Sequence, residues 1–230
     1  GFSLVKGWIR EKIQHQIAFV KDLKKNRPAL RDEMTQHIDA LTDLREKLDV
    51  LRGSIEKNRG SIMGIEGMAS AHYFDALSIA LPKQWQFSGR SRDPAKDAFN
   101  CLLNYGYGIL YSRVEKGCIL AGLDPYVGFL HTDNYNKKSF VFDFIEIYRN
   151  YIDRAVMGIF AKKQVHEGLF DPIPGGLYLN QDGKVVLIAA VNEMFDRNVP
   201  YRGRNVKIQN MIPMECHRIA NSLIKPEAEA

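Results

Sequence analysis

The sequence lacks any apolar run that approaches the ~18 residues a membrane-spanning helix needs. Its opening stretch, GFSLVKGWIREKIQ, is amphipathic and carries charge early, so we expect no signal peptide there. Cysteine is scarce: Cys101, Cys118 and Cys216 form no C-x-x-C pair. An odd number of cysteines in apolar helical contexts favours buried, reduced thiols over a disulfide framework, which fits a cytoplasmic protein.

Several common catalytic motifs are also missing. The sequence contains no G-x-S-x-G, no phosphate-binding P-loop and no G-x-G-x-x-G after an expected strand. Their absence sets aside the hydrolase, nucleotide-phosphate and dinucleotide chemistries that depend on those turns. We also find no internal repeat and no low-complexity segment.

Apolar residues, in contrast, are plentiful. They make up 45% of the 230 residues, which is enough to bury a core and excludes wholesale disorder. The net charge of +5 is uneven: residues 1–60 hold 13 basic against 9 acidic side chains, and residues 195–225 hold six against two. Such basic patches suit a polyanion, and solvated helix faces explain them equally well.

Helical periodicity dominates the first third of the chain. Amphipathic helices at about 4–26 and 29–52, broken at Pro28, predict an αα-hairpin. The next helix, IEGMASAHYFDALSIAL, is apolar nearly all round, which indicates burial. Glu66 lies near its start, where the helix N-terminus favours negative charge. A buried carboxylate must be neutral, paired or metal-bound, so Glu66 is a candidate site residue.

Three further helices are expected, at about 95–121, 140–161 and 203–224. Between the last two, GLYLN and KVVLIAA predict a β-hairpin that turns at Asp182-Gly183. The fold class is therefore mainly α with one small β-hairpin. We expect a single helical domain over residues 1–225, with the αα-hairpin part at 1–59, a core at 60–225 and a disordered tail at 226–230.

The stretch 128–149 gathers chemistry-bearing side chains: His131, Lys137, Lys138, Asp143 and Glu146. The two carboxylates stand three residues apart, which places them on one helix face, about 5–6 Å apart at Cβ. A histidine, two stacked acids and a basic pair indicate a site for a divalent metal and a phosphate. By spacing alone the signal is weak, because a lone histidine is more often in a core or on a surface and paired acids usually line a solvated face.

The loop 83–97, KQWQFSGRSRDPAKD, is basic with interleaved aromatic residues. Two interpretations fit it. Arg90 and Arg92, with Trp85 and Phe87, can contact a nucleic-acid backbone or bases. Equally, the segment can be a surface loop with a half-buried tryptophan.

Four segments in order, GIEGMASAHYF, RDPAKDAFNCLLNYGYGILYS, GLDPYVGFLH and SFVFDFIEIYR, resemble the CRISPR-associated protein 1 family. Its members are the spacer-acquisition endonucleases and integrases of CRISPR adaptation, an antiviral defence. The resemblance covers nearly all of residues 60–225. It implies that Glu66, His131 and Glu146 hold the metal, that Asp143 is a second acid near it and that Tyr111 is an active-site neighbour. Tyr105 and Tyr107 lie close to that position in the sequence.

An oxygen and nitrogen ligand set of this kind suits Mn²⁺ or Mg²⁺ more than a closed zinc site. The resemblance also implies double-stranded DNA, as protospacer and CRISPR repeat, and CRISPR-associated protein 2 as partners. A homodimer is implied for full-length members. Lys137 or Lys138 stands where the family places a basic residue. Members carry an N-terminal β-rich domain that is absent here, so we expect this chain to be the C-terminal catalytic domain.

The leading hypothesis is therefore metal-dependent DNA cleavage and integration, in which a 3′-hydroxyl attacks a phosphodiester. A second hypothesis is a non-catalytic helical DNA-binding or scaffold module with an unoccupied site. A third, a metal hydrolase acting on small phosphates, is disfavoured by the basic loop and the basic last helix, which suit a polymer.

Overall fold

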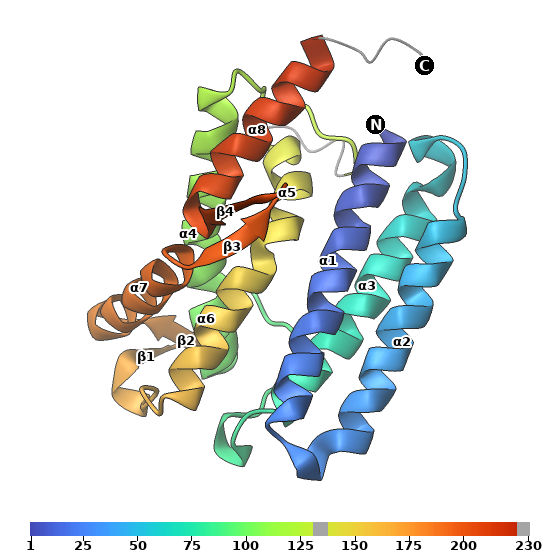
Figure 1. Cartoon of the computed structure of the whole chain (residues 1–230). Helices are drawn as coiled ribbons and strands as arrows, with labels where there is room; N and C mark the ends of the chain where they lie inside the picture. Colours follow the sequence, from blue (N-terminus) through green and yellow to red (C-terminus); the bar gives the residue numbers. More distant parts are fainter. Residues whose placement is uncertain (131–137, 225–230) are drawn as a thin grey trace.

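The computed structural model describes residues 1–130 and 138–224. Its N-terminal part is a layer of three long helices that lie side by side (Figure 1). They are α1 (Phe2–Lys25), α2 (Arg31–Val50) and α3 (Ile55–Ile79). The short helix η1 (Pro28–Leu30) reverses the chain between α1 and α2, because proline cannot continue α1. The predicted αα-hairpin is confirmed, and α3 packs against both of its helices.

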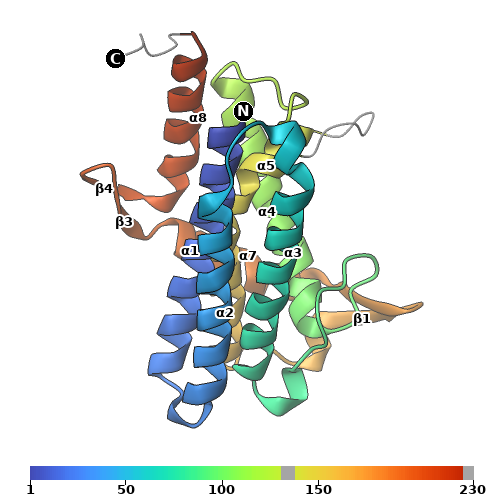
Figure 2. The same cartoon turned by 90° about the vertical axis from the view of Figure 1, so that its right-hand side faces the viewer.

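A second group of helices packs beside this layer (Figures 1 and 2). It comprises α4 (Ala98–Leu120), α5 (Ser139–Ile145), η3 (Glu146–Tyr148), α6 (Arg149–Ala161), α7 (Gln181–Phe195) and α8 (Ile208–Ile224). Helix α4 is central and packs against α5, α6, α7 and α8. Helix α1 joins the two groups, because it contacts α2 and α3 on one side and α5, η3 and α6 on the other. The mainly α fold class is confirmed.

Two helix boundaries differ from the expectation and bear on the site. Helix α3 starts at Ile55, so Glu66 lies roughly three turns inside it and not in its first turn. The helix N-terminus therefore does not stabilise Glu66. The single helix expected at 140–161 is interrupted by the 3₁₀ turn η3, which begins at Glu146.

The predicted hairpin with a turn at Asp182-Gly183 is wrong. GLYLN contributes β2 (Gly176–Leu179), which pairs antiparallel with the preceding β1 (Phe170–Ile173), whereas KVVLIAA belongs to α7. The physical reason is a helix cap: the Asn180 side chain accepts a hydrogen bond from the Gly183 N–H and starts α7. Only glycine fits at 183, since a Cβ there would lie 2.5 Å from the Leu169 carbonyl oxygen.

A second hairpin was not predicted. Strands β3 (Asn198–Tyr201) and β4 (Arg204–Lys207) pair through a two-residue turn at Arg202-Gly203, so α8 starts at residue 208 and not at 203. Both turn residues have positive φ, 49° and 77°, as a type I′ turn requires. In Figure 2 the two hairpins project from different sides of the helices.

Of the remaining expectations, the one on the cysteines is confirmed, and the one on the C-terminal tail concerns residues that the structure does not describe. All three cysteines are free and buried, as predicted. Single 3₁₀ turns form η2 (Lys83–Trp85) and η4 (Glu167–Leu169). Within the described ranges, none of the helices combines the length and the apolar character of a membrane span. The tail at 226–230 that we expect to be disordered lies outside the described residues.

Candidate active site

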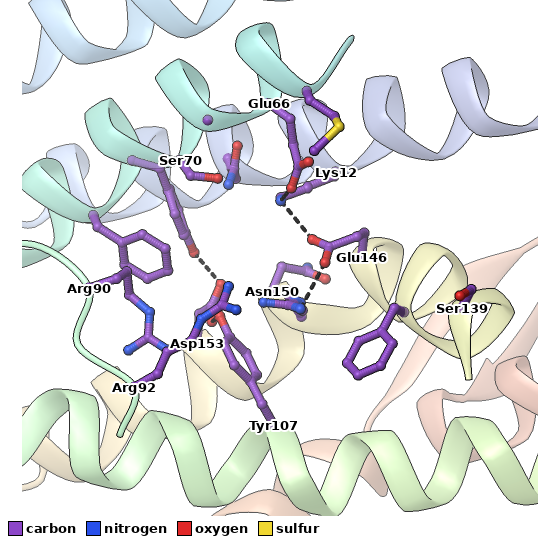
Figure 3. A pocket seen from close by; sticks show the side chains of 17 residues that line it. Lys12, Glu66, Ser70, Arg90, Arg92, Tyr107, Ser139, Glu146, Asn150 and Asp153 are labelled. Atoms are coloured by element: carbon purple, nitrogen blue, oxygen red, sulfur yellow. Dashed lines mark hydrogen bonds and ion pairs between the residues drawn. The ribbon is translucent and has the colours of Figure 1, made fainter. Parts of the chain in front are cut away.

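A pocket of about 490 Å³ lies between the N-terminal helical layer and the second group of helices (Figure 3). Its lining side chains come from α1, α3, the loop 83–97, α4 and the segment 139–153. Glu66 and Glu146, the two predicted ligands that the structure describes, both line it. They come from separate helical layers and face each other across the pocket (Figure 3).

Lys12 of α1 bridges these two carboxylates. Its Nζ lies 2.5 Å from Glu66 Oε1 and 2.6 Å from Glu146 Oε2. The Lys12 side chain is 8% exposed and that of Glu146 is 4% exposed. Burial alone lowers the pKa of Lys12, but the carboxylates of Glu146 and Glu66 outweigh it and raise that pKa above its ordinary value. The two acids therefore share one resident cation.

Arg149, at the start of α6, holds the second oxygen of Glu146. Its Nη2 lies 2.8 Å from Glu146 Oε1, a pair three residues apart on the helix. The Arg149 guanidinium also lies 4.7 Å from the centre of the Tyr107 ring, within cation–π range. Burial lowers the pKa of Arg149 more than any other single effect, but the neighbouring acidic groups, with Glu146 the strongest, together raise that pKa above its ordinary value, so the guanidinium stays charged. Glu146 is thus oriented from both sides, by Lys12 and by Arg149.

Asp153 lies deeper in the same pocket and accepts two hydrogen bonds. Tyr73 Oη donates to Asp153 Oδ2 at 2.7 Å, and Tyr107 Oη donates to Asp153 Oδ1 at 2.6 Å. Burial raises the pKa of Asp153 to about 6, although both tyrosine hydrogen bonds and the charge of Arg149 act to lower it. Three helices, α3, α4 and α6, therefore meet at one buried carboxylate.

Two of the predicted site residues, His131 and Lys137, lie outside the described residues. Among the described residues alone, no group of three or more His, Cys, Asp or Glu side chains is arranged to hold a metal. The three-ligand metal set of Glu66, His131 and Glu146 therefore stays a prediction. The two described members are brought together.

Asp143 does not line this pocket. It is 3% exposed, and its Oδ2 accepts hydrogen bonds from the backbone N–H groups of Phe129 at 2.7 Å and Leu130 at 2.8 Å. Asp143 thus anchors the chain immediately before residue 131. Its predicted role beside the metal stays a prediction, and the geometry adds a structural role.

Tyr111, in the second half of α4, and Lys138, immediately before α5, are not among the side chains that line the pocket. The Tyr111 ring packs 5.3 Å from that of Phe142, and Lys138 forms an ion pair with Glu115. Tyr107, one helical turn before Tyr111, does line the pocket. The predicted roles of Tyr111 and Lys138 remain predictions.

Each of the two interpretations of the loop 83–97 fits part of it. Its aromatic residues are structural: Phe87 stacks on Phe99 at 4.3 Å and Trp85 packs edge-on against Phe160. Its arginines line the pocket. Arg90 is half-buried and donates to Asn104 at 2.8 Å, while Arg92 is exposed. Both guanidinium groups lie at the other end of the pocket from the paired carboxylates in Figure 3.

The sequence reasoning missed the roles of Lys12, Arg149, Asp153 and Tyr73. Lys12 carries a signal that could have been found, because it stands next to Ile13 on the buried face of an amphipathic helix, where a lysine needs a partner. Arg149 and Asp153 follow Glu146 by three and seven residues, which is helical spacing for one face. No sequence signal identifies Tyr73 as the partner of Asp153.

Comparison with known proteins gives consistent matches. The family model described as CRISPR associated protein Cas1 matches residues 1–193. A protein of Archaeoglobus fulgidus named CRISPR-associated endonuclease Cas1 1 is 34% identical over 231 residues, covering 95% of this chain and 67% of the relative. One of the same name from Thermodesulfovibrio yellowstonii is 33% identical over 188 residues, covering 80% of this chain. This chain spans 67% and 58% of the length of these two relatives.

Solved structures share the fold over almost the whole chain. A Cas1 protein from Thermotoga maritima superposes with a TM-score of 0.80 at 25% identity, covering 100% of this chain and 67% of that one. A casposase bound to integration product superposes with a TM-score of 0.85 at 24% identity, covering 99% of this chain and 62% of that one. The helical architecture described above is therefore one that other proteins share.

Proposed function

Because this chain belongs to the CRISPR associated protein Cas1 family, we propose that it is the catalytic part of a metal-dependent DNA endonuclease and integrase that inserts spacers into a CRISPR array. The curated relatives are named endonucleases. One observation carries the proposal: Glu66 and Glu146, from different helical layers, converge on a single positive charge in a pocket that arginines also line.

The residues present fit a divalent cation. Lys12 Nζ stands in for it, since one oxygen of each carboxylate already lies within 2.6 Å of this ammonium nitrogen. Carboxylate oxygens are the ligands that Mg²⁺ and Mn²⁺ prefer. Glu66 and Glu146 would hold the metal together with His131, which lies outside the described residues. When bound, a metal of this kind polarises a phosphodiester and stabilises the charge that develops on its oxygens.

The chain's own side chains supply binding and orientation. Arg149 fixes the Glu146 carboxylate through a 2.8 Å ion pair, so that this acid is preorganised before DNA binds. Arg90 and Arg92 place positive charge in the same pocket, where they neutralise a DNA phosphate. With a DNA 3′-hydroxyl as nucleophile the reaction is integration, and with water it is cleavage. Neither needs a covalent enzyme intermediate.

We propose double-stranded DNA, as protospacer and repeat, as the substrate, and CRISPR-associated protein 2 and a second copy of the chain as partners in the cytoplasm. The names of the curated relatives, CRISPR-associated endonucleases, support a nucleic-acid substrate connected with CRISPR. A structure named as a Cas6-RT-Cas1--Cas2 complex shares this fold, with a TM-score of 0.82 at 23% identity. The proposal that CRISPR-associated protein 2 is a partner is based on the complex for which that structure is named.

The test is a strand-transfer assay with Mn²⁺, comparing Glu66→Gln and Glu146→Gln with wild type. We expect each variant to lose at least about 100-fold in rate, because a single preorganised electrostatic group contributes on that order. Glu56→Gln is the matched control, since Glu56 is exposed on the same helix as Glu66. Wild-type rates in both pocket variants would overturn the proposal.

One observation favours the alternative, a helical DNA-binding or scaffold module without catalysis. Lys12 already pairs with both acids, so Glu66, Lys12 and Glu146 can serve as a structural triad. A measurement of metal binding distinguishes the two functions. An integrase binds Mn²⁺ through Glu66, and a scaffold binds DNA equally well with or without Mn²⁺ and with Glu66→Gln.

A further inference from the structure

The hydrogen-bonded cluster of Asp153, Tyr73 and Tyr107 has no part in the function proposed above. Tyr73 is 0% exposed and Asp153 is 2% exposed, so the hydrogen bond between them is shielded from water, whereas the bond from Tyr107 is partly buried. A buried carboxylate costs free energy unless its oxygens are satisfied, and the two tyrosine hydroxyls satisfy one oxygen each. A feature this costly on the wall of the candidate active site calls for a physical role.

The cluster lies two helical turns along from the paired carboxylates, on the same two chain segments. Tyr73 follows Glu66 by seven residues on α3, and Asp153 follows Glu146 by seven residues along η3 and α6. Seven residues are two helical turns, which return a side chain to the same face about 10 Å further along. The Tyr73–Asp153 hydrogen bond is therefore a second link between the same two helix faces that Glu66, Lys12 and Glu146 connect.

Few other contacts hold α3 at its distance from α6. Helix α3 packs mainly against α1 and α2, while α6 packs against α4, α7 and α1. Among the described residues, the Tyr73–Asp153 bond is the only side-chain hydrogen bond between α3 and α6. Helix α1 packs against both helices, so it sets their general placement. The Tyr73–Asp153 bond is the direct side-chain link that fixes their spacing on the pocket side.

The other oxygen of Asp153 connects to the Glu146 side of the site. Tyr107 donates to Asp153 Oδ1 at 2.6 Å, and the ring of Tyr107 lies under the Arg149 guanidinium, which in turn holds Glu146. Asp153 thus acts on α3 through Tyr73 and on Arg149 through Tyr107.

We propose that Asp153 is a positioning residue that sets the separation of Glu66 and Glu146 through its hydrogen bond to Tyr73. The inference rests on the proposed function insofar as these two glutamates are metal ligands. It assigns Asp153 no contact with metal or DNA. Its effect is to keep the two carboxylates close enough to share one cation.

The test uses Tyr73→Phe, which removes only the hydroxyl and keeps the buried ring. Mn²⁺ binding to the full chain is measured by the electron paramagnetic resonance signal of free Mn²⁺. We expect the dissociation constant to rise about tenfold, the lower end of the effect of outer-shell partners on metal sites. Tyr151→Phe is the matched control, because its hydroxyl, also on the α6 side, contacts Met211 Sδ and not the pocket. An unchanged Mn²⁺ affinity in Tyr73→Phe, with thermal stability lowered as in the control, overturns the inference.

A second readout needs no metal. Spin labels on Ala71→Cys and Ala161→Cys, exposed positions on α3 and α6, report the helix separation, and the native cysteines are buried from the label. We expect Tyr73→Phe to shift or broaden this distance, and an unchanged distance overturns the inference. If wild type binds no Mn²⁺, the proposed function fails, and the spin-label distance still decides whether the bond sets the spacing.

Discussion

Lys12 and Glu146 form a 2.6 Å ion pair at a position where both side chains are more than nine-tenths buried. The same ammonium group pairs with Glu66 at 2.5 Å, so two carboxylates share one ammonium charge. Desolvating three charged groups is costly, and only this close mutual pairing offsets the cost. A divalent metal bound by these carboxylates competes with Lys12 for the same oxygens. Metal binding and the position of Lys12 are therefore coupled.

Lys12→Met should destabilise the metal-free chain by about 3–5 kcal/mol, because it removes the ammonium partner of Glu66 and leaves the buried Glu146 carboxylate with Arg149 alone. Denaturant unfolding measures the loss. Mn²⁺ should restore part of it, since a ligand that binds only the folded state stabilises that state. The control is Lys21→Met, an exposed lysine on α1 for which we expect a change within about 0.5 kcal/mol. Equal losses in the two variants would show that the triad adds nothing to stability.

Asp153→Asn should change how stability depends on pH. The folded-state pKa of Asp153 is raised from 3.8 to about 6, so its contribution to stability is complete below pH 4 and is lost as pH rises through 6. The asparagine side chain of the variant does not titrate. The stability difference between wild type and Asp153→Asn should therefore shift against wild type by about 2 kcal/mol from pH 4.5 to 7.5, at about 1.4 kcal/mol per pH unit. Urea unfolding at four pH values measures it, and a constant difference contradicts the burial argument.

Gly106→Ala should destabilise the contact between α4 and α6. A Cβ at this position would lie 2.6 Å from Ile152 Cγ2, and Ile152 is fully buried and cannot move aside. Overpacking of this kind costs about 1–3 kcal/mol, more than the roughly 0.5–1 kcal/mol that alanine gains over glycine inside a helix.

Gly108→Ala is the matched control on the same helix, because a Cβ there meets nothing within 4 Å. It should raise the melting temperature while Gly106→Ala lowers it. A rise in both variants would mean that α4 and α6 are not in close contact at Gly106.

Arg92→Ala should weaken DNA binding without unfolding the chain, since Arg92 is exposed at the pocket. If its guanidinium neutralises one phosphate, the slope of log affinity against log salt should fall in magnitude by about 0.9. Fluorescence anisotropy at several salt concentrations measures this slope. Arg31→Ala, an exposed arginine at the start of α2, should leave it unchanged. An unchanged slope in Arg92→Ala removes this residue from the DNA interface.

Periodic and local features could be predicted from the sequence alone. Met34, Leu41 and Leu48 are all fully buried and define one face of α2. Their seven-residue spacing is about two helical turns, so it places all three side chains on the same side of the helix. Glu66 could be singled out because a carboxylate on a nearly apolar helix must be neutral, paired or metal-bound. Local capping was harder: Asn180 starts α7 within a stretch whose alternation also suits a strand, so the sequence predicts the hairpin one segment too late.

By itself the sequence determined most of the helices, α7 excepted, and many of the faces they bury, and it showed that the Glu66 carboxylate must be neutral, paired or metal-bound. Only the tertiary structure decided that Glu66 pairs with Lys12, that Asp153 meets Tyr73 and Tyr107, and that Tyr107, not Tyr111, lines the pocket. The reason is physical. Helical periodicity is a property of one segment, whereas the pairing of side chains from α1, α3, α4 and α6 depends on how four helices pack, and no local spacing encodes that arrangement.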